Sequence, residues 1–484
     1  MKKAIQAVKN NKNEIYNTLG YVLPMFAGFL FLPIIQKTLS AEKYGILIII
    51  WLFTNLVGLM DFGMTRALTN KISNSESTQK SKDISQEILT LALISIIIMT
   101  IALTLKNIIF KVNVDSSLQN EFDFSYYLTC ISIPFIILTS GLRGALEGLS
   151  QFRTVNLLRV PLMAYNYIVP ALVILANSTN IFYISLFLLI GRILFFLLHY
   201  IAIQNKVIIN LGHFHFKNIK STLQTLNNIK WLAIIATLSP ILGSLDRWIV
   251  NGIVNTKQIG YYATPYEIVS RLGIIPSALI AVMIPSMLST QNIKTNRIIK
   301  SITYIDKTTY IMLPITAFFG LFSYEFLSLW MNADFANLSY LFLTIFSAGI
   351  LLNSIAGVPI NYLMSIGHDS IIAKNYIYQI IGYPLVLALV TYQWGPYAAA
   401  VVWFLRIFID LFVGFNKSHF LKEYKIFKLM TLILLQILII AHQFYYQTEH
   451  LYAKIIVYLI ILTFCGTIFF KREILNEQSK SEQY

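Results

Sequence analysis

Charged residues are scarce in this sequence: they make up 12% of its 484 residues, whereas apolar residues make up 56%. Soluble domains carry about 25% charged residues, so the composition excludes an ordinary soluble domain and indicates an integral membrane protein. The only two cysteines, Cys130 and Cys465, lie in apolar segments, which argues against a disulfide framework. Residues 1–16 lack the apolar core and cleavage site of a removable signal peptide, so we expect the first span to direct insertion.

Motifs for enzymatic chemistry are also absent. The sequence has no glycine-rich phosphate-binding loop ending in Lys-Ser or Lys-Thr, and no histidine and cysteine cluster at metal-ligand spacing. No polar segment is long enough for a catalytic domain, which argues against a membrane glycosyltransferase or a polysaccharide polymerase. We therefore expect no catalytic residues, no metal and no cofactor. If such a protein moves a solute across the membrane, it has no ATPase of its own and would use a proton or sodium gradient, the membrane potential, or the solute's own gradient.

Long apolar segments recur along the whole chain. A helix needs about 20 mostly apolar residues to cross a bilayer. Fourteen segments come close to this requirement, roughly at residues 17–36, 45–65, 86–109, 125–146, 156–176, 181–203, 229–251, 259–286, 308–331, 338–366, 370–393, 396–416, 426–445 and 452–470. The sequence therefore predicts an all-α integral membrane protein with about 14 transmembrane helices.

Lysine and arginine are distributed unevenly between the two sets of gaps that separate these spans. If the N-terminus is cytoplasmic, the inner gaps and the termini hold 27 of the 37 basic residues, and the outer gaps hold six. Cytoplasmic segments carry the excess of basic residues, so this bias predicts that both termini are cytoplasmic. The net charge of +15 is spread over short gaps instead of forming one patch, so we expect no binding to nucleic acid.

The longest inner gap follows the sixth span and divides the first twelve spans into two sets of six. A short echo between residues 39–45 and 254–260, which both end on a glycine, favours two parallel repeats around a central cavity. We predict an N-terminal six-helix half, a cytoplasmic linker, a second six-helix half, and two extra helices with a cytoplasmic tail, at residues 1–203, 204–228, 229–416 and 417–484.

Four arginines lie inside the predicted spans, where a charge is costly and needs a reason. Arg192, Arg271 and Arg406 lie near mid-depth, and Arg247 lies nearer the outer face. Amides also lie in the spans, either as cavity lining or as interhelical hydrogen bonds; they are Asn17, Asn55, Asn166, Asn353, Asn361 and Gln379.

Acidic residues accompany most of these arginines. Three oppositely charged pairs are four residues apart and so share one helix face: Arg143 with Glu147, Glu267 with Arg271, and Arg406 with Asp410. Asp246 directly precedes Arg247, so these two side chains point in different directions. Two interpretations stay open. In the first, the charges form ion pairs that tie helices together. In the second, the arginines line a cationic, water-filled cavity in which guanidinium groups clamp the phosphate oxygens of an anionic substrate.

Three stretches carry a resemblance to a known family. They are Leu-Met-Asp-Phe-Gly-Met-Thr-Arg-Ala at 59–67, Arg-Gly-Ala-Leu-Glu-Gly-Leu-Ser-Gln-Phe at 143–152, and Asp-Arg at 246–247 followed by Ile-Gly-Tyr-Tyr at 259–262. In this order and spacing they resemble the polysaccharide-transporter branch of the superfamily that also contains multidrug and toxin extrusion transporters and lipid II flippases. With the span count, the chain looks like an O-antigen flippase of the Wzx type.

The resemblance implies a flippase that moves undecaprenyl-diphosphate-linked oligosaccharide units to the outer leaflet of the bacterial inner membrane by alternating access. A polysaccharide polymerase and a chain-length regulator are then possible partners, beside membrane lipid. Many O-antigen flippases have twelve spans; the two extra spans resemble the last two of fourteen-span lipid II flippases. One alternative is a lipid II flippase. Another is an ion-coupled multidrug exporter of the same fold, which is less favoured because arginines dominate the interior.

The candidate site residues fall into two groups. The candidates for substrate binding are the four interior arginines together with two from the matched stretches: Arg192, Arg247, Arg271, Arg406, Arg66 and Arg143. The candidates for ion pairing or for coupling to a proton or sodium ion are the nearby acids Asp61, Glu147, Asp246, Glu267 and Asp410.

Overall fold

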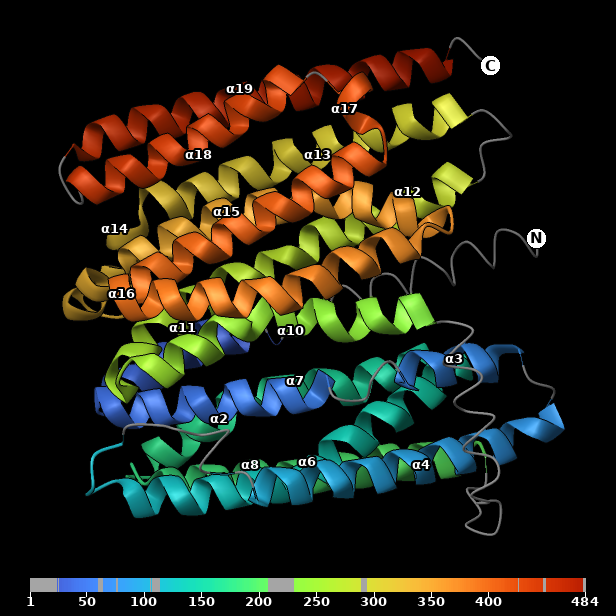
Figure 1. The fold of residues 1–484 in the computed structure, drawn as a ribbon, viewed down its shortest axis with the longest axis vertical. Coiled ribbons are helices and arrows are strands. Elements are labelled where there is room, and N and C mark those ends of the chain that lie inside the picture. The colour runs from blue at the N-terminus through green and yellow to red at the C-terminus, as the bar shows by residue number, and fades with distance from the viewer. Residues whose placement is uncertain are drawn as a thin grey trace. The chain divides into compact units, whose positions relative to one another are not determined.

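The computed structural model forms two compact units, Met1–Gly260 (unit 1) and Tyr261–Tyr484 (unit 2) (Figure 1). It describes residues 24, 26–59, 64–74, 77–104, 106, 114–207, 230–288, 294–424, 426–446 and 450–481. Within these ranges the regular structure is helical and no strand occurs. Helices satisfy their backbone hydrogen bonds internally, which is what a chain crossing lipid requires.

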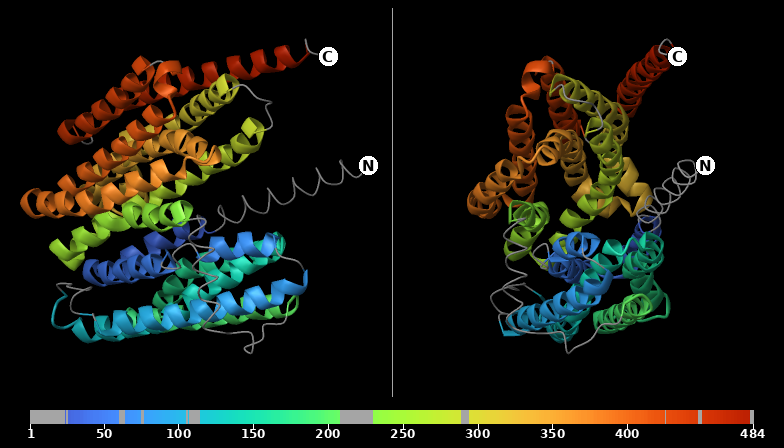
Figure 2. Two further views of the ribbon diagram at one scale, coloured as in Figure 1. Left: turned by 45° about the vertical axis from the view of Figure 1, so that its right-hand side comes forward. Right: turned by 90° about the vertical axis from the view of Figure 1, so that its right-hand side faces the viewer.

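Unit 1 is built around α6, which packs along both α4 and α8, and α3 covers one end of α6 (Figures 1 and 2). Its apolar helix Phe26–Thr38 is the described part of the first predicted span. The other helices of unit 1 are α2 (Ala41–Leu59), α3 (Met64–Asn74), α4 (Ser77–Thr104), α6 (Gln119–Gly148), α7 (Phe152–Leu175), α8 (Ile181–Gln204) and α10 (Lys230–Ile253), and the first turn of α11 (Thr256–Ser270) closes it.

Unit 2 is built around α15, whose side chains are buried along most of its length by α13, α14 and α16. The rest of α11 leads through a short 3-10 segment, η3 (Arg271–Gly273), into α12. The remaining helices are α12 (Ile274–Leu288), α13 (Lys294–Leu321), α14 (Ser323–Trp330), α15 (Ala333–Ser365), α16 (Asp369–Lys417), α17 (Phe420–Glu423), α18 (Ile426–Tyr446) and α19 (Leu451–Ser481).

Eleven helices in the described ranges are long and apolar enough to cross a membrane, or 12 if the bent pair α13–α14 is one span. This finding confirms an all-α membrane protein, whereas the count of 14 stays a prediction. Two local features explain the difference. The predicted spans 370–393 and 396–416 both fall within α16, whose Gly395 leaves the helical region with φ 77°. The predicted span 17–36 begins outside the described residues.

Two glycines allow the similar segments 39–45 and 254–260 to contact each other directly inside unit 1. A Cβ atom on Gly45, near the start of α2, would lie 1.8 Å from the carbonyl oxygen of Thr256 at the start of α11. A Cβ atom on Gly260 would lie 2.8 Å from the ring of Tyr44. Only glycine permits so close a backbone approach, so each echoing segment supplies a glycine to the same helix crossing.

The C-terminal pair α18–α19 packs along α13 (Figure 1). Polar groups tie the pair to α13 and α14 at both of its ends. Lys428 of α18 forms an ion pair with Asp306 of α13. Nζ of Lys454 in α19 lies 2.9 Å from Oε1 of Glu325 in α14. At the same end of the pair as Lys454, the side-chain amide of Gln443 donates to the carbonyl oxygen of Leu321. Both lysines lie at the starts of the predicted spans 426–445 and 452–470, and each pairs with a carboxylate of another helix.

The ion pair of Lys454 gives a test of how the C-terminal pair is held. The Lys454 side chain is fully buried, whereas that of Glu325 is 25% exposed. We expect Glu325→Ala to lower the free energy of unfolding by about 2 kcal/mol, because a buried ammonium group loses its carboxylate. Lys454→Met removes the buried charge and keeps the bulk of the side chain, so we expect it to lower the free energy of unfolding by less than Glu325→Ala does. Unfolding of the purified variants in detergent measures both free-energy changes. Equal losses of stability would contradict the ion pair between Lys454 and Glu325.

Candidate functional site

Arg192 lies half-way along α8, and its guanidinium group bonds to the neighbouring helix α7. Its Nη2 donates to Oδ1 of Asn166 at 2.8 Å. Gly191 allows α7 to come close, because a Cβ atom there would lie 2.1 Å from the ring of Tyr165. Arg192 itself is partly exposed. Among the described residues no carboxylate pairs with Arg192, so its charge is available to an anion.

The predicted pairing of charges four residues apart is present at all three places. Arg271 lies in η3, where its Nη2 is 3.5 Å from Oε2 of Glu267 and its Nε donates to the Glu267 carbonyl oxygen at 3.0 Å. The Arg143 Nε lies 3.8 Å from Oε1 of Glu147, and both side chains are about one-third exposed. These two arginines therefore share their charge with an acid four residues away in the chain.

Arg406 and Asp410 belong to a buried network inside α16. One Asp410 oxygen accepts from Nδ2 of Asn375 at 2.9 Å and from Nε2 of Gln379 at 2.6 Å. Its other oxygen lies 3.5 Å from Nη1 of Arg406, and both charged side chains are less than 10% exposed. The Arg406 guanidinium lies 5.8 Å from the ring centre of Tyr383. Because these residues lie on both sides of Gly395, the network joins the two arms of a helical hairpin, which favours the interpretation as a structural ion pair.

The remaining candidates are placed in unit 1. Asp246 and Arg247 of α10 are both buried, and Nη2 of Arg247 donates to the carbonyl oxygen of Gly243 at 2.8 Å. Asp61 lies outside the described residues, and the structure gives for Arg66 only its place in α3. The candidate arginines of unit 1 are therefore on four different helices, α3, α6, α8 and α10.

Helix packing explains Gly144, the first of the two glycines in the matched stretch 143–152. The hydroxyl of Thr69 in α3 donates to the carbonyl oxygen of Gly144 in α6 at 2.9 Å. A Cβ atom on Gly144 would lie 2.8 Å from the carbonyl oxygen of Thr65. This stretch therefore holds α3 against the end of α6, where Arg143 and Glu147 are partly exposed.

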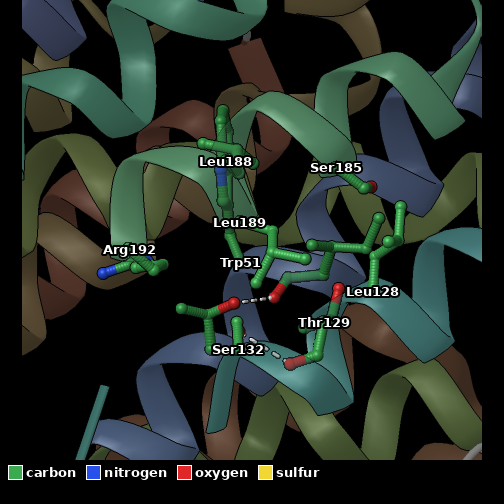
Figure 3. Close-up of a pocket in the computed structure, with 10 residues that line it drawn as sticks. Trp51, Leu128, Thr129, Ser132, Ser185, Leu188, Leu189 and Arg192 are labelled. Atoms are coloured by element: carbon green, nitrogen blue, oxygen red, sulfur yellow. Dashed lines mark hydrogen bonds between the residues drawn. The ribbon is translucent and has the colours of Figure 1, made fainter. Parts of the chain in front are cut away.

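A small pocket between α2, α6 and α8 was not expected from the sequence (Figure 3). Arg192 and Trp51 line it together with the hydroxyl groups of Thr54, Thr129, Ser132 and Ser185. The sequence offered little signal, because single serines and threonines in apolar helices commonly bond to their own backbone. In the described ranges no group of three or more histidine, cysteine, aspartate or glutamate residues could hold a metal ion.

Comparison with known proteins identifies the family. A family model described as "Polysaccharide biosynthesis protein" matches residues 11–291, which is more than half of the chain. The chain belongs to this family. As a member of the polysaccharide biosynthesis family, it is 24% identical over 406 residues to the "Putative O-antigen transporter" of Shigella flexneri. That alignment covers 82% of the chain and 95% of the relative.

Solved structures give the fold of this family member. The lipid II flippase MurJ in an inward closed conformation matches with a TM-score of 0.72 at 15% identity, covering 96% of the chain and 99% of MurJ. An inward-facing multidrug resistance transporter of the MATE family in the MOP superfamily matches with a TM-score of 0.63 at 13% identity, covering 84% and 96%. The protein is therefore a multi-pass membrane transporter with the fold of this superfamily, and not an enzyme.

Proposed function

We propose that this transporter flips undecaprenyl-diphosphate-linked oligosaccharide units of a surface polysaccharide, such as O-antigen, from the inner to the outer leaflet of the bacterial inner membrane. Family membership and the similarity to an O-antigen transporter support the transport of a polysaccharide precursor. The proposal includes alternating access between two six-helix halves, cytoplasmic termini, and coupling to a proton or sodium gradient. Delivery to a polysaccharide polymerase and a chain-length regulator would follow in the outer leaflet.

The observation that carries the proposal is the environment of Arg192. A guanidinium group keeps its positive charge inside a membrane and binds phosphate oxygens in a bidentate manner. The Asn166 amide takes up one of its donors and orients the group, while its partial exposure leaves the others accessible. A lipid diphosphate is an anion that such a group fits inside a bilayer, with the sugar on one side and the apolar tail on the other.

The other candidate residues divide according to their contacts. Arg271 is partly exposed beside Glu267, so we keep it as a second candidate for the diphosphate. The buried pair Arg406–Asp410 is assigned to the stability of α16, and the role of Arg66, Arg143 and Arg247 stays a prediction.

Arg192→Ala is expected to reduce flipping about tenfold to hundredfold, because charge-assisted hydrogen bonds to the diphosphate are lost. Proteoliposomes with a labelled undecaprenyl-diphosphate oligosaccharide measure the rate, and surface polysaccharide measures the effect in cells. Arg192→Lys keeps the charge but not the bidentate geometry, so its rate should fall between the two. Arg153→Ala serves as the matched control, because Arg153 is an exposed residue near the start of α7. Normal flipping by a stable Arg192→Ala protein would refute the assignment.

A second substrate, lipid II, is favoured by one specific observation. The match to MurJ covers 96% of the chain, whereas the match to the MATE transporter covers 84%, as expected if MurJ also has the C-terminal pair. Lipid II has the same diphosphate, so Arg192 would serve both substrates. Expression in cells depleted of their lipid II flippase separates the two: we expect no rescue of growth, and rescue would favour lipid II.

A further inference from the structure

The pocket beside Arg192 is lined by four buried residues with hydroxyl groups, here called the floor, and by two partly exposed residues, here called the rim (Figure 3). The hydroxyl-bearing residues of the floor come from three helices and are each less than 10% exposed: Thr54 of α2, Thr129 and Ser132 of α6, and Ser185 of α8. The rim residues Trp51 and Arg192 are partly exposed. The pocket therefore opens at the charged and aromatic end and is closed at the hydroxyl end.

Three of the floor hydroxyls offer acceptors to the pocket. Each donates its proton to a carbonyl oxygen of its own helix: Thr54 to Ile50 at 2.8 Å, Thr129 to Ser125 at 2.7 Å and Ser132 to Thr129 at 2.7 Å. A hydroxyl oxygen has two lone pairs, and these remain after the proton has been donated. The three side chains thus present only acceptors to whatever occupies the pocket.

Two further groups offer donors without a partner. Within the described part of the chain, the buried Oγ of Ser185 and the buried Nε1 of Trp51 make no hydrogen bond. A buried donor that lacks an acceptor is costly, and native structures rarely contain one without a water or ligand. The residues that carry these two donors and the three acceptors all line the pocket, so a group that both donates and accepts can pair with donors and acceptors there.

Size and charge narrow the choice of occupant. The pocket has room for about one water molecule. The guanidinium of Arg192 is at its rim and no carboxylate lines it, so a cation is disfavoured. An apolar group would leave both donors unpaired. A hydroxyl group can accept from both donors through its two lone pairs, can donate its one proton to one of the acceptors, and has the right size.

We propose that this pocket receives one hydroxyl group of the substrate's saccharide, so that Ser185 and Trp51 contribute to its specificity. The inference rests on the proposed function, because a diphosphate held by Arg192 places the adjoining sugar next to the rim. The indole ring of Trp51, whose centre lies 5.4 Å from that of Tyr167, adds an aromatic surface against which the sugar packs. A water molecule takes the place of the hydroxyl when no substrate is bound.

Binding to two lipid probes tests the pocket separately from the function. The probes are undecaprenyl diphosphate without a sugar and the same lipid carrying one N-acetylhexosamine, titrated into the purified full-length protein in nanodiscs. We expect the wild-type protein to bind the sugar-bearing lipid about tenfold more tightly, the equivalent of roughly one hydrogen bond. Ser185→Ala and Trp51→Phe should each reduce this preference severalfold and leave the affinity for the bare lipid unchanged.

Ser125→Ala is the matched control. Ser125 is also a fully buried residue of α6 whose Oγ makes no hydrogen bond within the described ranges, but it does not line the pocket. Its variant should keep the wild-type preference. Because neither serine hydroxyl bonds to another described residue, both variants should fold and unfold at close to the wild-type temperature.

The outcomes separate the two proposals. If Ser185→Ala and Trp51→Phe retain the full preference for the sugar-bearing lipid, the pocket holds a structural water only and the inference is overturned. If both lipids bind the wild-type protein equally, the inference fails while the proposed function stands. If neither lipid binds, or Arg192→Ala binds the bare lipid as well as wild type, the proposed function itself fails.

Discussion

Asp410→Ala is expected to destabilise the protein by about 3–5 kcal/mol, because it leaves the Arg406 guanidinium buried without its carboxylate. The remaining contacts of Arg406 are weaker: Oε1 of Gln379 lies 3.5 Å from Nη1, and the Tyr383 ring lies beyond. We expect Arg406→Ala to destabilise the protein by less than Asp410→Ala does. Asp410 then keeps the Asn375 and Gln379 donors, and a carboxyl group can take up a proton, whereas a guanidinium stays charged. Unfolding in detergent measures both losses.

A double variant decides between the two interpretations of Arg406. Arg406→Met combined with Asp410→Leu replaces the buried pair by apolar side chains of similar volume, a change that is often neutral or stabilising. We expect this variant to accumulate in the membrane and to flip its substrate at close to the wild-type rate. A stable double variant that no longer transports would instead assign Arg406 to the substrate.

Gly45→Ala is expected to lower the free energy of unfolding by about 3 kcal/mol, because overpacking at this crossing has no easy relief. The added Cβ would lie 1.8 Å from the carbonyl oxygen and 2.8 Å from the carbonyl carbon of Thr256. Both atoms belong to the backbone, so no change of side-chain rotamer removes the overlap. The start of α11 would have to move away from α2, with lower membrane abundance and a lower unfolding temperature as the measured results.

Two other glycines serve as graded controls for Gly45. Gly260→Ala meets only the ring of Tyr44, at 2.8 Å, so we expect a smaller loss. A Cβ atom on Gly243 in α10 has no described atom within 4 Å, and alanine favours a helix over glycine by about 1 kcal/mol. Gly243→Ala should therefore be neutral or stabilising. An equal effect of all three variants would show that the crossing of α2 and α11 is not tightly packed.

The sequence predicted most of the helices because a lipid environment demands long apolar runs. The predicted span 181–203 agrees with α8 (Ile181–Gln204), and the predicted span 338–366 agrees with α15 (Ala333–Ser365). The 73° bend between α13 and α14 was missed. Hydropathy records how apolar a segment is and not its direction, so a bend at Phe322 leaves the pattern of the predicted span 308–331 unchanged.

The candidate site was predictable only where one helix supplies both partners. The spacing of Arg406 and Asp410 predicted their ion pair, since residues four apart share a helix face. The bonds of Arg192 to Asn166, and of Gln379 to Asp410, join separate helical segments, and their pairing depends on packing that the sequence does not reveal. The hydroxyl pocket was missed for the same reason, because it needs three helices to form.

The ties of the C-terminal pair restrict how this architecture can change in evolution. Asp306 and Glu325 carry charges on α13 and α14, and each is balanced by a lysine of the last two helices. A chain that lost those helices would turn both carboxylates towards lipid, where an unbalanced charge is costly. We therefore expect related proteins without the C-terminal pair to have neutral residues at the positions of Asp306 and Glu325. Loss of the two helices and loss of the two acids should occur together within one lineage.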